Sequence, residues 1–163
     1  MSSKPKIITD YDEFKKAVDN RCKKYKASMG TAIEHGGDLR DKIIELNSVV
    51  SSVDEVYATA MLWWGLQKER VENVKALAMV ALLTEEKHKK IPATLKRYHL
   101  DIVEIEYEGM KTTFNEEKVR LVWCKYAVDS FQTTLKTIDR AIMGRQSGLK
   151  FDIEEMKRLG YGQ

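Results

Sequence analysis

The sequence has few residues that break helices, cross-link the chain or favour a membrane. Two prolines and nine glycines among 163 residues leave most of the chain free to form long helices. The two cysteines, Cys22 and Cys124, match no metal-binding or redox spacing, which predicts reduced thiols in a cytoplasmic protein. The longest apolar run has eight residues (76–83), and residues 2–6 are polar. We therefore expect neither a membrane span nor a secretion signal.

An excess of charge of one sign is also missing. The net charge of +3 implies no chain-wide attraction to polyanions, so a nucleic-acid site would depend on local clusters of Lys and Arg. The composition, 43% hydrophobic and 33% charged, is typical of a soluble helical protein with many surface ion pairs. The length suits one domain, which we expect at residues 9–163 after a flexible arm at residues 1–8.

A regular apolar repeat runs from Phe114 to Leu149. Its members step by three and four residues, which places them on one face of a helix. Only Glu117 and Arg145 lie on this seam without being apolar. The apolar members are Phe114, Leu121, Cys124, Val128, Phe131, Leu135, Ile138, Ile142 and Leu149.

This seam has two interpretations. It is either the inner face of a monomeric bundle or a coiled-coil interface between subunits. Further apolar residues on the same helix, Val119 and Val122 among them, also need cover, which favours a homo-oligomer. On that interpretation the oligomerisation residues are Leu121, Val128, Phe131, Leu135, Ile138 and Ile142.

Capping residues and breakers predict the helices of the first half. A first helix begins after Thr9 or Asp10 and ends near His35 at the pair Gly36-Gly37. Its apolar face comprises Tyr11, Phe14, Val18, Cys22 and Tyr25. A second helix, capped by Asp38, reaches about Val50, and residues 52–55 (SVDE) fit a capping box that begins a third. This third helix continues to about Lys90, and its residues 76–83, apolar all round, are expected in the deepest part of the core.

The second half is predicted to be helical as well. Pro92 suits the first turn of a helix that extends to Gly109, although the alternation of apolar residues and Glu at 103–108 is that of a strand. We prefer the helix because no comparable partner strand is visible. Asn115 begins the seam helix, Gly144 and Gly148 weaken its end, and Asp152 caps a short final helix. The predicted fold is all-α, a multi-helix bundle with a long, heptad-patterned C-terminal helix.

The sequence shows no recognisable catalytic or metal-binding motif. His35, His88 and His99 lack a second ligand at a metal-binding spacing. Gly36-Gly37 is not a phosphate-binding loop, and no serine or cysteine lies in a nucleophile motif. We therefore expect a protein that is not an enzyme and that uses neither a metal nor another cofactor.

Basic residues gather in three clusters. The densest consists of Lys87, Lys89 and Lys90, with Lys96 and Arg97 just beyond Pro92. Such cations neutralise phosphates, and the neighbouring Tyr98 offers a ring on which an unpaired base stacks. The alternative is a solvated helix end, where cations are favourable in any protein. The other clusters are Arg21, Lys23, Lys24 and Lys26, and Arg140, Arg145, Lys150, Lys157 and Arg158.

The order of these features in residues 69–159 resembles the T4-type phage recombination mediator (UvsY-like) family. The similar stretches are residues 70–75 leading to 87–90, residues 135–140, and the finish at 153–159. Members of that family are small helical proteins that help load a recombinase onto single-stranded DNA and assemble through a C-terminal helix. The resemblance implies DNA contacts at Lys87, Lys89 and Lys90. It also implies a recombinase or single-strand-binding protein as partner, and a place in the host cytoplasm if the protein is phage-encoded.

Two functions therefore follow from the sequence. The first is a non-enzymatic accessory protein that binds single-stranded DNA in recombination or replication, as a homo-oligomer. The second is a helical protein–protein interaction module, such as a phage assembly factor, a virion component or an inhibitor that occludes a partner. A DNA-binding protein would bring Lys24, Lys90, Arg97 and Arg145 onto one face, whereas a protein-binding module would disperse them.

Overall fold

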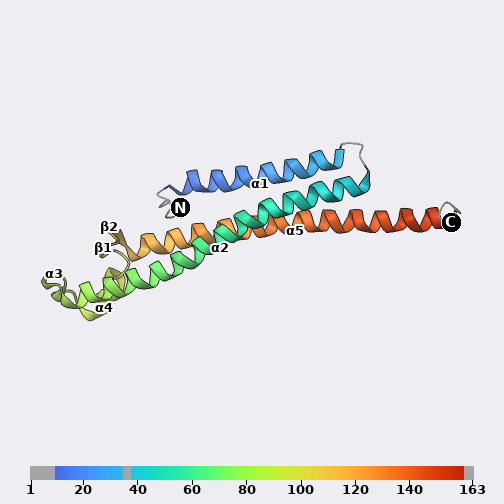
Figure 1. Cartoon of the computed structure of the whole chain (residues 1–163). Helices are drawn as coiled ribbons and strands as arrows, with labels where there is room; N and C mark the ends of the chain where they lie inside the picture. Colours follow the sequence, from blue (N-terminus) through green and yellow to red (C-terminus); the bar gives the residue numbers. More distant parts are fainter. Residues whose placement is uncertain (1–9, 35–37, 160–163) are drawn as a thin grey trace. The chain divides into compact units, whose positions relative to one another are not determined.

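The computed structural model describes residues 10–34 and 38–159, and it confirms an all-α protein (Figure 1). The helices are α1 (Tyr11–Glu34), α2 (Leu39–Thr84), α3 (Glu86–Lys89), α4 (Ala93–His99) and α5 (Phe114–Arg158). A single small hairpin, β1 (Glu104–Tyr107) and β2 (Met110–Thr113), is the only sheet in this part of the chain. The predicted arm at residues 1–8 and the breaker Gly36-Gly37 lie outside the described residues.

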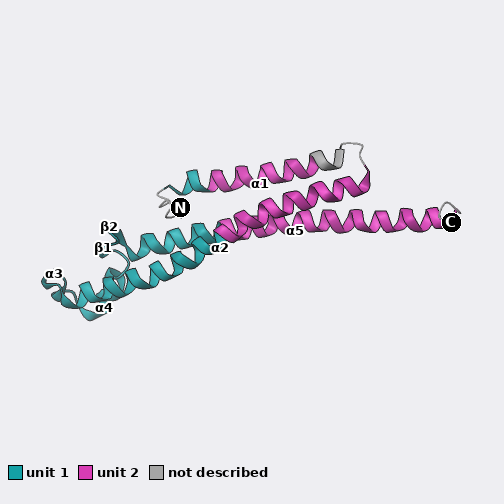
Figure 2. Cartoon of the chain, in the orientation of Figure 1, with its two compact units in different colours: residues 1–14, 60–126 teal, residues 15–59, 127–163 magenta. Residues whose placement is uncertain are grey.

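The chain divides into two compact units, each containing part of α2 and part of α5 (Figure 2). Unit 1 comprises residues 1–14 and 60–126, and so includes α3, α4 and the hairpin. Unit 2 comprises residues 15–59 and 127–163, and the secondary structure of its described part is all helical. Each unit has a hydrophobic core of its own.

Helix α1 begins where the sequence predicts. The side chain of Asp10 accepts hydrogen bonds from the backbone amides of Asp12 (2.8 Å) and Glu13 (3.1 Å), which satisfies two free donors of the first turn. The predicted face is confirmed: Phe14, Val18 and Cys22 are buried.

The core of unit 2 is formed by residues from three helical segments. Leu46, Val53 and Ile138 are completely buried, and Ile142 is nearly so. Tyr25 and Met29 of α1 pack against this cluster, and the Tyr25 hydroxyl donates a hydrogen bond to the carbonyl of Ser52 (3.4 Å). The apolar residues of α5 therefore pack within the chain in this unit.

The predicted boundary between two helices at residues 51–52 is wrong, because α2 is continuous from Leu39 to Thr84. Ser52 does not cap a helix; its hydroxyl donates to the carbonyl of Ser48, four residues earlier (3.2 Å). Leu46 and Val53 are buried on either side of this point. Packing of the continuing apolar face thus outweighs the local capping signal.

Helix α5 is also longer than predicted. It begins at Phe114, after a capping box in which the Thr113 hydroxyl accepts from the Glu116 amide (3.2 Å) and the Glu116 carboxylate accepts from the Thr113 amide (3.1 Å). The predicted start at Asn115 and the separate final helix capped by Asp152 are wrong, since α5 continues through Gly144 and Gly148 to Arg158.

Replacing Gly144 with alanine is expected to raise the free energy of unfolding by about 0.5–1 kcal/mol. A glycine in a helix interior loses more backbone entropy on folding than alanine does. Nothing in the described structure lies within 4 Å of a Cβ added at Gly144. Urea denaturation of the variant and the unmodified protein measures the difference. A loss of stability would contradict a helix that continues through this position.

The predicted helix through residues 103–108 is wrong as well. Helix α4 ends at His99, and β1 pairs with β2 in an antiparallel register that sets Glu104 opposite Thr113 and Tyr107 opposite Met110. The two turn residues, Glu108 (φ 54°) and Gly109 (φ 78°), both have the positive φ of a type I′ hairpin turn. The partner strand has only four residues and little alternation, so the hydrophobic pattern did not reveal it.

The core of unit 1 lies between α2 and the hairpin. It comprises Val74, Ala78, Ala81, Leu82, Val103 and Ile105. The expectation that residues 76–83 lie in the deepest part of the core holds for one side of the helix only. Ala78, Ala81 and Leu82 are buried in this core, whereas four residues of the segment are exposed: Leu77, Met79, Val80 and Leu83. One side of this apolar segment packs on the hairpin, and the other side faces solvent.

Candidate nucleic-acid interface and buried carboxylate

The five predicted DNA-contacting residues all lie in unit 1, in and around α3 and α4 (Figure 1). Lys87 and Lys89 belong to α3, Lys90 is its C-cap, and Lys96 and Arg97 lie in the last turn of α4. Residues 85–99 contain these five cations and two carboxylates, an excess of +3 that equals the net charge of the whole chain. The charge imbalance of the protein is thus present in one short segment.

Two of the five cations have acidic partners close in sequence. The ammonium of Lys87 lies 2.8 Å from a carboxylate oxygen of Glu85, and Lys89 pairs with Glu86. The hydrogen bond from Lys87 lowers the pKa of Glu85 below its usual value and outweighs the opposing effect of desolvation. Both pairs are exposed to solvent, where ion pairs contribute little to stability. Lys87 and Lys89 therefore remain able to contact phosphate.

The other three cations have no ion-pair partner in the described part of the chain. Within residues 10–34 and 38–159, no carboxylate forms an ion pair with Lys90, Lys96 or Arg97. The ring of Tyr98 follows them directly and is 74% exposed. The structure therefore combines unpaired cations and a free aromatic ring at the α3–α4 segment.

The other two basic clusters, at residues 21–26 and 140–158, belong to unit 2. Lys24 and Arg145 belong to unit 2, whereas Lys90 and Arg97 belong to unit 1. Arg145 is half-buried and its guanidinium donates to the carbonyl of Ala141 (2.9 Å). The four cations whose arrangement was to distinguish the two functions are thus divided between the two units, and only the densest cluster, at α3 and α4, is a candidate site within unit 1.

The predicted oligomerisation residues lie mainly inside the chain. Val128, Phe131, Ile138 and Ile142 are buried, and Leu121 and Leu135 are half-buried. Ile138, Ile142 and Leu135 pack in the core of unit 2. The interpretation of the seam as the inner face of a bundle accounts for these contacts without a second subunit.

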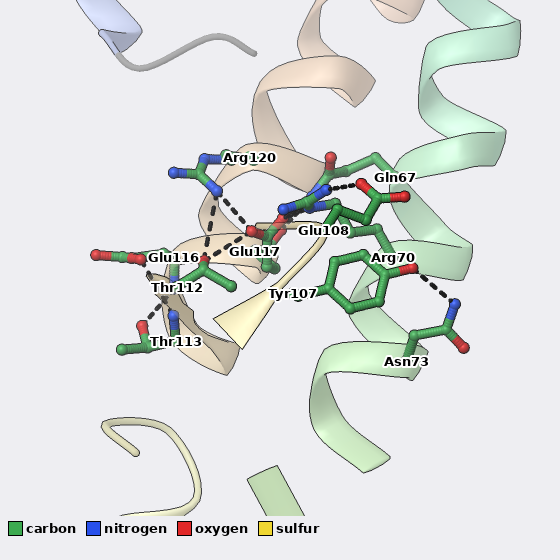
Figure 3. Close-up of polar contacts among 10 residues, drawn as sticks. All are labelled: Gln67, Arg70, Asn73, Tyr107, Glu108, Thr112, Thr113, Glu116, Glu117 and Arg120. Atoms are coloured by element: carbon green, nitrogen blue, oxygen red, sulfur yellow. Dashed lines mark hydrogen bonds and ion pairs between the residues drawn. The ribbon is translucent and has the colours of Figure 1, made fainter. Parts of the chain in front are cut away.

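A buried ionic network, which the sequence did not predict, surrounds Glu117 in unit 1 (Figure 3). Glu117 is completely buried on the seam of α5. One carboxylate oxygen accepts from Gln67 Nε2 (2.7 Å) and Arg70 Nε (2.9 Å) of α2. The other accepts from the Thr112 hydroxyl (2.7 Å) and from Arg120 Nη1 (2.5 Å). The network therefore joins α2, β2 and α5.

The hairpin covers this network on one side. Arg70 also forms an ion pair with Glu108 in the turn (2.6 Å), and its guanidinium lies 4.8 Å from the centre of the Tyr107 ring. The Tyr107 hydroxyl accepts a hydrogen bond from Asn73 Nδ2 (3.1 Å; Figure 3). Arg70 thus takes part in two of these three contacts between α2 and the hairpin.

Glu117 is ionised in the folded protein. Burial raises its pKa, but the hydrogen bonds from Gln67 and Thr112 and the charges of Arg120 and Arg70 outweigh this effect, so the pKa is lowered. Each of the four side chains that form a hydrogen bond with the carboxylate is a donor, and so stabilises the anion. The signal available in the sequence was a carboxylate at a seam position.

Other chemistry is not evident in the described part of the chain. There, no three His, Cys, Asp or Glu side chains are grouped so as to hold a metal ion. Burial raises the pKa of the Cys124 thiol to about 11, which makes it a poor nucleophile. No helix among the described residues has both the length and the apolar character needed to cross a bilayer.

Comparison with protein families, curated proteins and solved structures gives no match.

Proposed function

We propose that this chain is a non-enzymatic accessory protein that binds single-stranded DNA through its α3–α4 segment. The observation that supports this function best is that Lys90, Lys96 and Arg97, which have no ion-pair partner among the described residues, lie in the same short segment as the exposed ring of Tyr98. Lys and Arg neutralise backbone phosphates, and an aromatic ring stacks on an unpaired base whatever its identity. The resemblance to recombination mediators extends the proposal to a role in recombination or replication.

In this proposal the five cations and the tyrosine act together. Lys90, Lys96 and Arg97 contact phosphates directly, while Lys87 and Lys89 exchange exposed carboxylate partners for phosphate. Stacking of one base on Tyr98 adds about 1–3 kcal/mol. Because neither contact reads base edges, binding has little sequence preference.

The test is fluorescence anisotropy with a labelled single-stranded oligonucleotide at two salt concentrations. The logarithm of the binding constant falls by about 0.7 per phosphate contact for each tenfold rise in salt. Five contacts therefore lower the affinity roughly 500-fold between about 50 and about 300 mM salt. Replacing Lys90, Lys96 and Arg97 with glutamine is expected to weaken binding and to reduce the salt slope by about 2.

A matched control replaces three exposed cations outside this segment, Lys16, Arg40 and Lys136, with glutamine. This variant has the same net charge as the first, so it separates a local site from general electrostatic attraction. It is expected to bind nearly as well as the unmodified protein. Equal losses in the two variants, or an affinity that does not change with salt, would contradict the proposal.

A second candidate function is a helical protein–protein interaction module. The observation that favours it is the outer side of α2 in unit 1, where Leu62, Leu66, Val80 and Leu83 are exposed. Exposed apolar residues that gather on one side of a helix are typical of a contact surface. This candidate predicts no DNA binding even at low salt.

A further inference from the structure

The outer side of α2 in unit 1 carries a second heptad pattern, distinct from the buried seam of α5. Its members step by four and three residues along more than 20 residues, which is the spacing of a coiled-coil contact rather than of scattered surface residues. We name it the α2 heptad face and define it as Leu62, Leu66, Glu69, Asn73, Ala76, Val80 and Leu83.

The α2 heptad face is exposed and held in place. All seven side chains are exposed, with Leu62 at 61% and Leu83 at 64%. The opposite side of the helix is anchored in the core of unit 1 through Val74, Ala78 and Leu82. At about 1.5 Å per residue the face is about 32 Å long. The helix is already formed, so a partner would not have to order it on binding.

The sequence of the face is complementary to itself in one orientation. An antiparallel pairing in which residue numbers sum to 142 sets Leu62 against Val80 of a second copy and Leu66 against Ala76. At the centre it sets Glu69 against Asn73, whose amide is a hydrogen-bond donor to a carboxylate. A parallel pairing would instead oppose Glu69 to Glu69, which is repulsive. The polar centre therefore selects the antiparallel orientation.

The side chains at the centre are available for this contact. Asn73 uses one amide hydrogen for the Tyr107 hydroxyl (3.1 Å), which fixes its rotamer and leaves the second hydrogen free. Within the described residues, Glu69 forms no ion pair or side-chain hydrogen bond. Glu72 of the two copies would approach at the rim, where each is next to its own Lys75 (3.9 Å) and the repulsion is screened.

We propose that the α2 heptad face joins two copies of this chain as an antiparallel, two-fold symmetric dimer. One surface serves both partners, because Leu62 meets Val80, Leu66 meets Ala76 and Glu69 meets Asn73 of the other copy, while Leu83 lies beyond the paired stretch. The contact contains none of the five cations of the α3–α4 segment, so the dimer would leave the proposed DNA-binding residues free, and it can form whether or not the chain binds DNA. Dimerisation would join two DNA-binding segments and increase their avidity.

Light scattering across a concentration series tests the dimer. The unmodified chain is expected to have twice the monomer mass of 18.8 kDa at high concentration. Leu66→Glu with Val80→Glu is expected to raise the dissociation constant at least about 100-fold, because each change occurs twice in a symmetric interface. Met143→Glu, at an equally exposed position of α5, is the control and leaves the mass unchanged. A monomer at all concentrations, or equal effects of the two variants, would overturn the proposal.

Cysteine cross-linking tests the orientation. In the antiparallel pairing, a Leu66→Cys chain forms a disulfide with an Ala76→Cys chain on oxidation, and neither chain cross-links efficiently when alone. A parallel dimer would cross-link each variant with itself, which would overturn the assignment. The native Cys22 and Cys124 are buried and stay in place. Circular dichroism confirms that each variant is folded.

Discussion

Glu117→Ala is expected to lower the free energy of unfolding by about 3–5 kcal/mol. The substitution removes the anion that Arg70, Arg120, Gln67 and Thr112 all contact, and it leaves two guanidinium groups largely buried without their shared partner. Taking a charge out of water is costly, so a buried cation that loses its anion is strongly destabilising. Urea denaturation followed by circular dichroism measures the loss.

A control in the same helix separates the network from the general effect of removing a carboxylate. Glu154 is exposed near the end of α5, and Glu154→Ala is expected to change stability by less than about 0.5 kcal/mol. Glu117→Gln retains the side-chain volume and one acceptor oxygen, and we expect it to lie between the two. A Glu117→Ala variant as stable as the Glu154→Ala variant would show that the network does not stabilise the fold.

The stability from Glu117 also depends on pH in a defined direction. Its pKa is lowered in the folded protein from the usual value of 4.5. The folded state therefore binds this proton less tightly than the unfolded state does. The stabilisation is fully present above pH 4.5 and is lost as the pH falls through the folded pKa. The stability difference between the unmodified protein and Glu117→Gln should narrow in acid; a constant difference from neutral pH to pH 3.5 would contradict the mechanism.

Leu46→Ala is expected to cost about 2–5 kcal/mol, the second large effect. Leu46 is completely buried in the core of unit 2, where it packs with Val53, Ile138 and Ile142. Alanine would leave a cavity among these residues, and the loss combines the transfer of the missing methylenes with the contacts that the cavity removes. Thermal denaturation and urea denaturation both report the change.

The chain offers a matched control two residues away. Ile44 lies in the same helix and is 58% exposed, so Ile44→Ala should change stability by less than about 0.5 kcal/mol. The comparison also tests which side of α2 faces the core. If the helix were rotated by one residue, the two side chains would be buried to a similar extent and the two variants would lose similar stability. A large loss at Ile44 with little loss at Leu46 would contradict the packing of unit 2.

Some features of the fold follow directly from local periodicity. The buried faces of α1 and α5 were predicted residue by residue, because Phe14, Val18, Phe131 and Ile138 recur at helical spacing, which places them on one side of a helix whatever they pack against. The basic segment around α3 and α4 was also visible in the sequence, because its cations lie close together along the chain. Sequence neighbours remain neighbours in a short turn, so their charges stay together.

Other features depend on competition between signals that the sequence presents with similar strength. Ser52 had the pattern of a helix start, and Val103 to Tyr107 matched both a helix and a strand. The first was decided by packing of Leu46 and Val53 on α5, the second by pairing with a strand too short to recognise. In the first case contacts between distant residues, and in the second pairing across a tight turn, outweighed a local preference of about 1 kcal/mol.

The sequence alone therefore determined the helical class, the inner faces of the long helices and the position of the densest charge. Tertiary structure decided which side of residues 76–83 is exposed, because a segment that is apolar all round has no periodicity to orient it. It also decided that Glu117 is an ionised, buried residue. That result needs Arg70, 47 positions away in the chain, and no pattern in a single sequence shows which distant cation will face a given carboxylate.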